Sequence, residues 1–298
     1  MDPNWDDMRV FLSVAREESL SGAGRLLKLD PATVGRRISR LEAALEAPLF
    51  VKSPQGYTLT AAGERLLAHG EQAEEAMRAA TEAMTGPAET LSGTIRIGAP
   101  DGCANFILPQ VASRIASENP DLDIQILALP RVINLSRREA DIAITVSPPT
   151  AGQLLVQKIC DYGLSLMATR RYLRKNPEIT SVADLRDHRL IGYIPDMIFD
   201  RELDYLADLG IERVQLASNS VAVQRHLVSQ SSALGIVHDF IMAFDRRLEK
   251  VLADQISLTR SFFLVRHQGD QRSERLNRLA DLLSQGIREE VARLSAPA

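Results

Sequence analysis

A short run near the N-terminus reads DPATVGRRISRLE at residues 30–42. Asp30 is suited to cap the N-terminus of a helix, and Pro31 suits the first helical position because that position needs no backbone N–H. Apolar residues then recur at helical spacing, which predicts an inward face formed by Val34, Ile38 and Leu41. The run therefore predicts a helix from Pro31 to about Glu46.

This predicted helix concentrates positive charge. It carries Arg36, Arg37 and Arg40, and no acidic residue lies between Pro31 and Leu41. The guanidiniums could meet phosphates, while short side chains at the helix start would let it enter the major groove of DNA; these are Pro31, Ala32, Thr33 and Gly35. Taken alone, a basic face is also typical of a solvated amphipathic helix.

A hairpin predicted directly after this helix favours the DNA-binding interpretation. Phe50-Val51 and Tyr57-Thr58-Leu59-Thr60 flank the run KSPQG, in which Lys52 and Ser53 precede turn-forming residues. Two helices are expected upstream, one over residues 21–27 capped by Ser19, and one with an inward face formed by Trp5, Met8, Phe11, Leu12 and Ala15. Three helices and a basic hairpin predict an all-α winged helix-turn-helix domain over residues 1–60.

The bulk composition confines any DNA contact to this region. The chain has 298 residues, a net charge of -4 and 45% hydrophobic residues, so we expect several folding units without an overall basic field. Cys103 and Cys160 form no CxxC pair and have no histidines at ligand spacing, which predicts neither a zinc site nor a disulfide. With no export signal or membrane span in the sequence, we expect a cytoplasmic protein that contacts no membrane.

Two further regions follow the predicted winged helix. Residues 61–90 are rich in helix formers and end at Gly86-Pro87; their apolar stripe, typical of helix pairing, consists of Leu66, Ala73, Met77, Ala80 and Met84. Residues 91–298 alternate strands with helices, which predicts an α/β domain. The expected strands lie at 94–97, 122–127, 142–146, 164–168, 190–193, 215–217, 235–237 and 262–266, and helices at 106–117 and 274–294.

The ordered motifs closely resemble those of LysR-type transcriptional regulators, over essentially the whole chain. The matching runs are WDDMRVFL at residues 5–12, SLS at 19–21, ATVGRRISRLE at 32–42, PLF at 48–50, GYTLTAAG at 56–63, GTIRIGAP at 93–100 and READIAI at 138–144. The resemblance implies a homodimer through the 61–90 helix, commonly a homotetramer, with RNA polymerase as a further partner. It implies that residues Asp30 to Arg37 read the major groove and that Lys52 and Ser53 contact DNA from the wing.

For residues 91–298, the resemblance implies an effector-binding domain of periplasmic-binding-protein type. Two subdomains, joined by two crossing strands, would enclose a small-molecule cleft. Subdomain I would contain residues 91–163 and 267–298, and subdomain II residues 164–266. No cofactor is expected, and the effector is not identified by the sequence.

This sequence departs from the family pattern at four positions. Gly22 and Gly24 stand where alanine is usual, which predicts a looser second helix. Gly35 stands where serine is usual, so one hydroxyl contact to DNA is expected to be missing. Lys52 stands where arginine is usual, which removes bidentate contact geometry.

Polar groups at predicted strand ends are the candidates for effector contact, since helix N-termini there expose free N–H groups. Three segments qualify: Asp101-Gly102-Cys103, Ser147-Pro148 and Ser218-Asn219-Ser220. Arg131 and His238 are further candidates, although Arg131 could be simply solvated and the two serines could be ordinary helix caps. Asp101 would disfavour a simple anion nearby.

Other function classes find less support in the sequence. We see no phosphate loop, GxSxG motif or metal-ligand cluster of an enzyme. A transport-type solute-binding protein would account for residues 91–298 but not for the winged helix. A thiol-based redox sensor would use Cys103, whose expected place at a helix N-terminus would lower its pKa, but Cys160 is distant in sequence.

Overall fold

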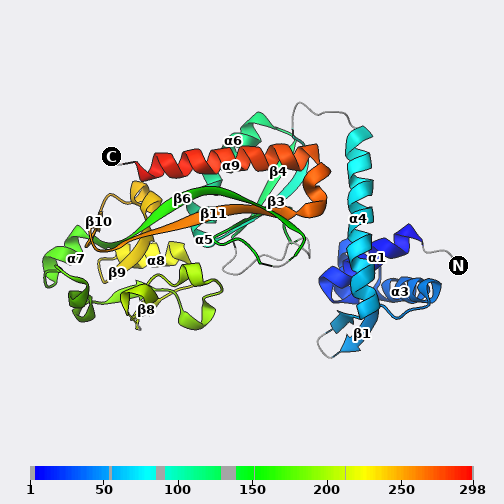
Figure 1. Cartoon of the computed structure of the whole chain (residues 1–298), viewed down its shortest axis with the longest axis horizontal. Coiled ribbons are helices and arrows are strands. Elements are labelled where there is room, and N and C mark those ends of the chain that lie inside the picture. The colour runs from blue at the N-terminus through cyan, green and yellow to red at the C-terminus, as the bar shows by residue number, and fades with distance from the viewer. Residues whose placement is uncertain are drawn as a thin grey trace. The chain divides into compact units, whose positions relative to one another are not determined.

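The computed structural model describes residues 4–53, 56–84, 91–128, 139–150, 152–211 and 213–296. The chain divides into two compact units, each described by itself (Figure 1). The N-terminal unit comprises the residues before Thr90 with Gln268–Glu274, and the C-terminal unit most of the remainder. No helix in the described ranges is long and apolar enough to cross a membrane.

The N-terminal unit has the predicted three helices, hairpin and long helix. Its elements are α1 (Trp5–Glu17), α2 (Leu20–Leu27), α3 (Pro31–Leu45), β1 (Phe50–Ser53), β2 (Gly56–Leu59) and α4 (Ala61–Met84). The predicted caps are confirmed, because Ser19 accepts a hydrogen bond from the Gly22 N–H and Asp30 accepts one from the Thr33 N–H. β1 and β2 are antiparallel, with Phe50 opposite Leu59.

The core of this unit is wider than the predicted stripe on α1. Phe11 and Leu12 are fully buried, as expected, but Val10 and Val14 are buried as well. They pack with apolar residues of α2 and α3 in one cluster, so the inward face of α1 covers more than one stripe.

Gly24 lies where the chain turns back from α2 toward α3. A Cβ at this position would lie 2.6 Å from the Leu29 carbonyl oxygen, and the Leu29 N–H donates to the Gly24 carbonyl at 2.9 Å. Glycine therefore permits a close turn that a methyl group would obstruct, a role beyond the expected loosening of the helix.

The C-terminal unit contains one nine-stranded sheet in the order β4-β3-β5-β11-β6-β9-β7-β8, with β10 paired to β6. Its strands are β3 (Gly93–Ala99), β4 (Leu122–Ala128), β5 (Ile142–Thr145), β6 (Leu154–Thr169), β7 (Leu190–Gly192), β8 (Leu216–Ala217), β9 (Leu234–His238), β10 (Leu248–Lys250) and β11 (Ser257–His267). Its α-helices are α5 (Asp101–Phe106), α6 (Leu108–Glu118), α7 (Arg170–Lys175), α8 (Val221–Ser229) and α9 (Glu274–Ser295). Its short 3₁₀ helices include η2 (Val182–Asp187), η3 (Pro195–Met197), η4 (Arg201–Leu203), η5 (Ala207–Leu209) and η6 (Asp239–Phe244). A further one, η7 (Gln268–Arg272), lies in the segment that belongs to the N-terminal unit.

Two long antiparallel strands, β6 and β11, run through both halves of this sheet (Figure 1). On one side, β11 pairs with β5, which is parallel to β3; on the other, β6 pairs with β9, which is parallel to β7. β11 pairs with β5 from Phe263, where its register to β6 also shifts. Phe263 to Val265, which pair with β5, lie within the range 164–266 that the sequence assigns to subdomain II, and that boundary stays a prediction.

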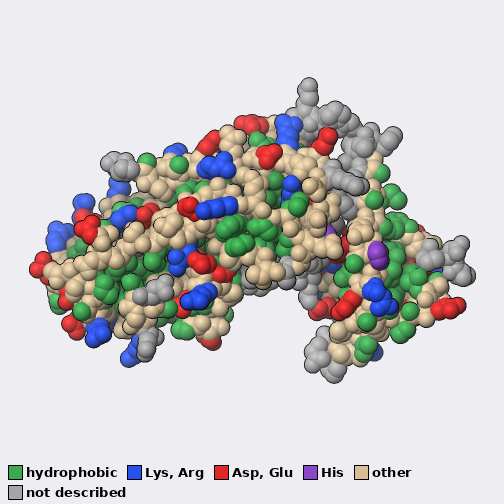
Figure 2. Space-filling model, in the orientation of Figure 1, with side chains coloured by type: hydrophobic (Ala, Val, Ile, Leu, Met, Phe, Trp, Pro, Cys, Tyr) green, Lys and Arg blue, Asp and Glu red, His purple; other side chains and the backbone are tan. Residues whose placement is uncertain are grey.

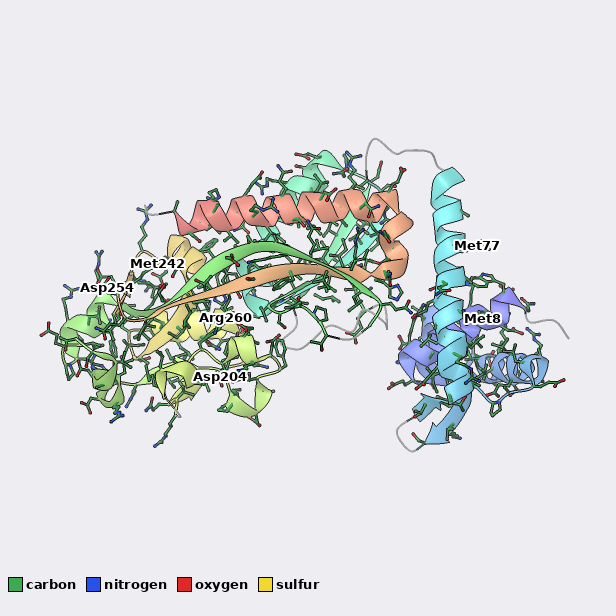
Figure 3. The ribbon with its side chains drawn as sticks, in the orientation of Figure 1. Met8, Met77, Asp204, Met242, Asp254 and Arg260 are labelled. Carbon is green, nitrogen blue, oxygen red and sulfur yellow. The ribbon has the colours of Figure 1, made fainter. Side chains whose placement is uncertain are left out.

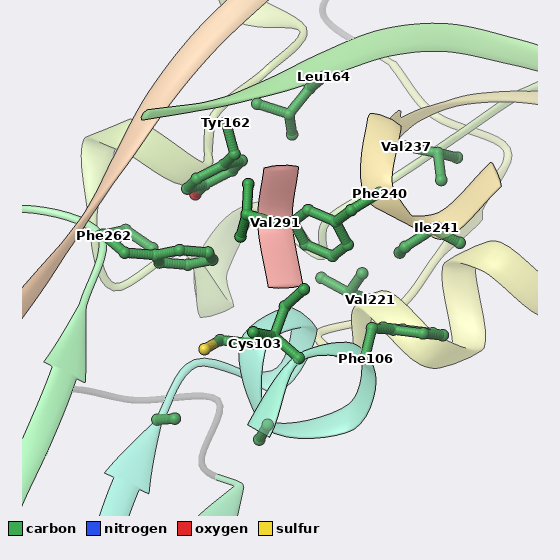
Figure 4. Close-up of a cluster of buried hydrophobic side chains, with 14 of the residues drawn as sticks. Cys103, Phe106, Tyr162, Leu164, Val221, Val237, Phe240, Ile241, Phe262 and Val291 are labelled. Carbon is green, nitrogen blue, oxygen red and sulfur yellow. The ribbon is translucent and has the colours of Figure 1, made fainter. Parts of the chain in front are cut away.

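Helices cover this sheet and carry the first candidate site residues. The predicted helix over 106–117 corresponds to α6, and the shorter α5 precedes it and ends at Phe106. α9 packs on α6 and β6, since Arg288 donates to the Ile159 carbonyl and Arg114 to the Gly286 carbonyl. Figure 4 shows Cys103 of α5 inside a cluster of buried side chains with Phe106, Phe240, Phe262 and Val291.

Candidate functional site

The start of α3 is a local hydrogen-bond network. The Asp30 carboxylate accepts from the Thr33 backbone N–H at 2.8 Å and from its hydroxyl at 2.5 Å. The Thr33 oxygen in turn accepts from the Arg36 guanidinium at 2.8 Å. Hydrogen bonds from the Thr33 hydroxyl and, to a lesser extent, from its backbone N–H lower the pKa of Asp30. Through Thr33, this end of α3 links a carboxylate to the exposed Arg36.

The arginines of α3 have different surroundings. Arg36 is exposed and Arg37 is half-buried. Arg40 is also exposed but donates through Nε and Nη2 to Asp7, whose side chain retains 2% exposure. Arg40 therefore connects α3 to α1. Its contact with DNA stays a prediction, and Nε and Nη2 are already engaged by Asp7.

Sequence reasoning missed Asp7, although a signal was present. Asp7, Val10, Phe11 and Val14 are spaced at i, i+3, i+4 and i+7 and are all buried, which is the spacing of one helix face. A carboxylate on an apolar face needs a buried or bridging partner, and Arg40 supplies it.

The hairpin is fixed to the rest of the N-terminal unit. The Tyr57 N–H donates to the Glu18 carbonyl at 2.9 Å, at the end of α1. Lys52 is exposed on β1, and the half-buried Ser53 hydroxyl donates to the Gly56 carbonyl at 3.2 Å. Residues 54–55 of the predicted turn lie outside the described residues. Of the other candidates, Pro31 and Ala32 are exposed and Gly35 is half-buried.

In the C-terminal unit, Asp101 joins two of the predicted effector segments. Its carboxylate, on the first residue of α5, accepts from the Ser220 hydroxyl and from the Ala222 backbone N–H, both at 3.0 Å. Ser220 is the N-cap of α8. Because β3 leads into α5 and β7 to β9 surround α8, a carboxylate of subdomain I occupies the N-terminal end of a helix of subdomain II.

The remaining predicted segment, Ser147-Pro148, bridges the subdomains at a second point. The Ser147 hydroxyl, which follows β5, donates to the Asp200 carboxylate. Pro148 is exposed, and Arg131 lies outside the described residues. Ser218 accepts from the Ser220 N–H at 3.1 Å and Asn219 is half-buried, so both serines have the capping and turn roles that the sequence also allowed.

His238 ends β9 inside an aromatic cluster. Its ring stacks on Tyr162 at 5.3 Å between centroids and lies 4.9 Å from Phe240. Burial lowers the pKa of His238 to about 3, so the imidazole is neutral near pH 7. A Cβ on Gly102 would come within 3.3 Å of this ring, so α5 packs directly on it.

The environment of Cys103 contradicts the expected low-pKa thiol. Cys103 is fully buried, and burial followed by the influence of Cys160 raises its pKa. Burial also raises the pKa of Cys160 to about 11. A buried thiol is poorly ionised and therefore poorly reactive. The described ranges also contain no group of three or more potential metal-ligating side chains.

Beyond the predicted residues, a cavity of about 710 Å³ opens at the carboxyl end of β7. Its lining includes Tyr193, Phe199, Asp200, Asp204 and Tyr205, together with Gln224 of α8. Tyr193 ends the predicted strand at 190–193, and Phe199 to Tyr205 follow it, a place where α/β sheets bind ligands, but their spacing shows no periodic pattern. Their place at the end of a predicted strand was the one signal in the sequence that could have identified them.

An arginine of β11 lies in the same region of the unit. Arg260 donates to the Glu202 carbonyl at 3.0 Å and forms an ion pair with the Glu202 carboxylate at 2.7 Å. Figure 3 labels Arg260 and Asp204. Since Arg260 is neutralised by Glu202, the carboxylates of Asp200 and Asp204 dominate the charge of the cavity wall, opposed by the exposed Arg201. Elsewhere on the visible face of this unit, acidic and basic side chains are interspersed (Figure 2).

Comparisons with known proteins agree with both units. Residues 5–64 match the bacterial regulatory helix-turn-helix protein family of lysR type, and residues 88–288 match the LysR substrate binding domain. The HTH-type transcriptional regulator PtxR of Pseudomonas aeruginosa is 25% identical over 245 residues, which cover 80% of this chain and 78% of PtxR.

Solved structures show the same fold. CrgA, a LysR-type transcriptional regulator from Neisseria meningitidis, has a TM-score of 0.60 at 22% identity, with 96% of this chain and 99% of CrgA covered. Full-length LysG from Corynebacterium glutamicum, with bound effector Arg, has a TM-score of 0.65 at 17% identity, with 96% and 98% covered. The chain belongs to the LysR family of transcriptional regulators, which bind DNA under the control of a small-molecule effector.

Proposed function

We propose that this regulator grips its operator through the start of α3 and the β1-β2 hairpin. The observation that carries the proposal is the exposed Arg36 beside the short side chains of α3, in the same unit as the exposed Lys52. Guanidinium and ammonium groups bind phosphates, and short side chains admit a helix to the major groove. The candidates for contact remain Asp30, Pro31, Ala32, Thr33, Gly35, Arg36, Arg37, Arg40, Lys52 and Ser53.

A salt titration of DNA binding tests this assignment. Arg36→Ala and Lys52→Ala are each expected to weaken binding to all sequences and to reduce the salt slope by about 1, because each removes a phosphate contact. Thr33→Ala is expected to change sequence preference instead. Arg171→Ala, which removes an exposed arginine of α7, is the matched control. Unchanged salt slopes in the first two variants would refute the phosphate contacts.

We propose that the chain dimerises through α4 and assembles further into a tetramer. Ala73, Met77 and Ala80 of the predicted stripe are exposed along this helix, and small side chains permit close helix pairing. Ala73→Glu is expected to weaken the dimer in sedimentation equilibrium, with Gln72→Glu at a neighbouring exposed position as the control. A dimer equally stable in both variants would exclude this helix face. RNA polymerase is proposed as a partner at the promoter.

We propose that the effector binds in the cleft between the subdomains and carries an amino or guanidino group. Asp101 already occupies the N-terminal end of α8, where an anionic ligand would otherwise find free N–H groups. The adjoining cavity offers the carboxylates of Asp200 and Asp204 beside aromatic rings, which suit a cation. The relative LysG was solved with Arg as its effector, so arginine is a reasonable first probe.

The effector assignment has a direct test. Arginine is expected to raise the unfolding temperature of the wild-type chain, and Asp204→Asn to reduce that increase, with Asp123→Asn in β4 as the control. Linkage requires that operator DNA change the affinity for the effector by the same factor by which the effector changes DNA affinity. Equal effector affinities with and without operator DNA would refute effector control through this site.

A further inference from the structure

A second cavity lies at the opposite end of the strands of subdomain II. It has a volume of about 450 Å³, and its lining includes Leu190, where β7 begins, and Gln215, immediately before β8. Effectors of α/β sheets bind at the carboxyl ends of strands, where the larger cavity lies. The second cavity is therefore separate from the proposed effector site, although Gly210 and Ile211 line both.

His188 brings an unpaired polar atom to this cavity. The residue is 4% exposed, and its Nδ1 lies 2.9 Å from the Tyr172 hydroxyl. Its Nε2 is buried without a hydrogen-bond partner. If the phenol donates to Nδ1, the neutral ring carries its proton on Nε2. His188 lines the cavity and Tyr172 does not, so a lining residue holds a ring nitrogen without a partner.

The other polar groups of the lining also favour an anion. Arg186 and Arg213 are exposed, and neither has an ion-pair partner within the described ranges. No described lining residue is Asp or Glu. The Gln215 side-chain oxygen accepts from the Leu190 N–H at 2.8 Å, and its NH₂ group can donate to a ligand. The remaining walls are largely apolar, with Val182, Leu185 and Leu209.

We propose that this cavity is a second ligand site, which binds a small organic carboxylate. The carboxylate would accept from His188 Nε2 and pair with Arg186 and Arg213, while its hydrocarbon part would contact the leucines. Bidentate arginine contacts recognise carboxylates specifically. Because Gly210 and Ile211 line both cavities, a ligand bound in the second cavity would contact part of the wall of the effector cavity. The proposal goes beyond DNA binding and the cleft effector, and its test uses neither.

The test titrates benzoate into the purified full-length chain and follows binding by calorimetry. We expect saturable binding of benzoate and none of benzamide, which has the same shape without the charge. Arg186→Gln combined with Arg213→Gln should weaken benzoate binding at least about tenfold, a loss of about 1.4 kcal/mol, while Arg171→Gln, on an exposed arginine of the same subdomain, should leave it unchanged. His188→Gln should weaken it as well.

Hydrogen exchange locates the bound probe. Benzoate should slow amide exchange in residues 182–190 and 209–215, and leave residues 101–105 and 218–222 unchanged. The proposal is overturned if benzoate does not bind saturably, if benzamide binds equally well, or if the double arginine variant retains full affinity. Protection confined to residues 193–205 and 218–222 would place benzoate in the effector cleft and would also overturn it.

Discussion

Removing the carboxylate of Asp101 should release the N-terminal end of α8. The Ala222 N–H is at the second position of that helix, where a backbone N–H has no acceptor within the helix, and its acceptor is the Asp101 carboxylate at 3.0 Å. A hydrogen bond to a charged group contributes about 1.5–3 kcal/mol. At about 1.4 kcal/mol per factor of ten, Asp101→Ala should speed exchange of the Ala222 amide by about 10- to 140-fold.

Hydrogen exchange with site resolution measures this effect in the full-length chain. Asn105→Ala is the control, because Asn105 donates to the other oxygen of Asp101 from within α5 and leaves the bonds to Ser220 and Ala222 in place. We expect little change at Ala222 in the control. If the Ala222 amide exchanges at the wild-type rate in Asp101→Ala, the bridge between the subdomains does not hold this end of α8 and the reasoning fails.

Further predictions concern stability. Gly24→Ala should lower the unfolding free energy by about 1–3 kcal/mol because its methyl group would meet a carbonyl oxygen. Gly35→Ala, whose Cβ would make only an ordinary contact 3.5 Å from Leu20 Cδ1, should raise it by about 0.5–1 kcal/mol; chemical denaturation distinguishes the two variants. For His238, with its folded pKa lowered to about 3, only the unfolded chain takes up a proton below pH about 6.5. As the pH is lowered from about 6.5 toward 3, the unfolding free energy should therefore decrease by up to about 1.4 kcal/mol per pH unit. His238→Gln should remove this contribution from unfolding curves measured across that range. Arg40→Ala should lower the unfolding midpoint, because it leaves the buried Asp7 carboxylate unpaired, and the added change Asp7→Asn should restore part of the loss.

The N-terminal unit could be predicted closely because its signals are local. Asp30 and Pro31 mark the start of α3 through capping chemistry that acts within one turn. The α/β order of the C-terminal unit followed from alternating patterns, but β6 extends from Leu154 to Thr169 while only its second half was predicted. That first half contains Gln157, Lys158 and Asp161, and polar residues on a strand that crosses between subdomains hide the apolar signal.

The candidate effector site could be predicted only in part, since its contacts join distant segments. The strand-end rule selected Asp101, Ser147 and Ser220, which form hydrogen bonds between the subdomains, although it could not tell that Asp101 would pair with α8; their contact with an effector stays a prediction. It missed Asp204 and Tyr205, which belong to an irregular segment without periodicity. For Cys103, the helix N-terminus was foreseen correctly, but its effect on the thiol was outweighed by burial.

The bridge made by Asp101 limits what an effector can be. An anion entering at the N-terminal end of α8 competes with a carboxylate that already accepts two hydrogen bonds there. It therefore gains less than it would at an open helix end with free N–H groups. A cationic ligand beside Asp200 and Asp204 meets the carboxylates of the cavity wall and leaves the Asp101 bridge intact. Because a cation does not compete with that bridge, its binding free energy is not reduced by loss of the two hydrogen bonds to Asp101.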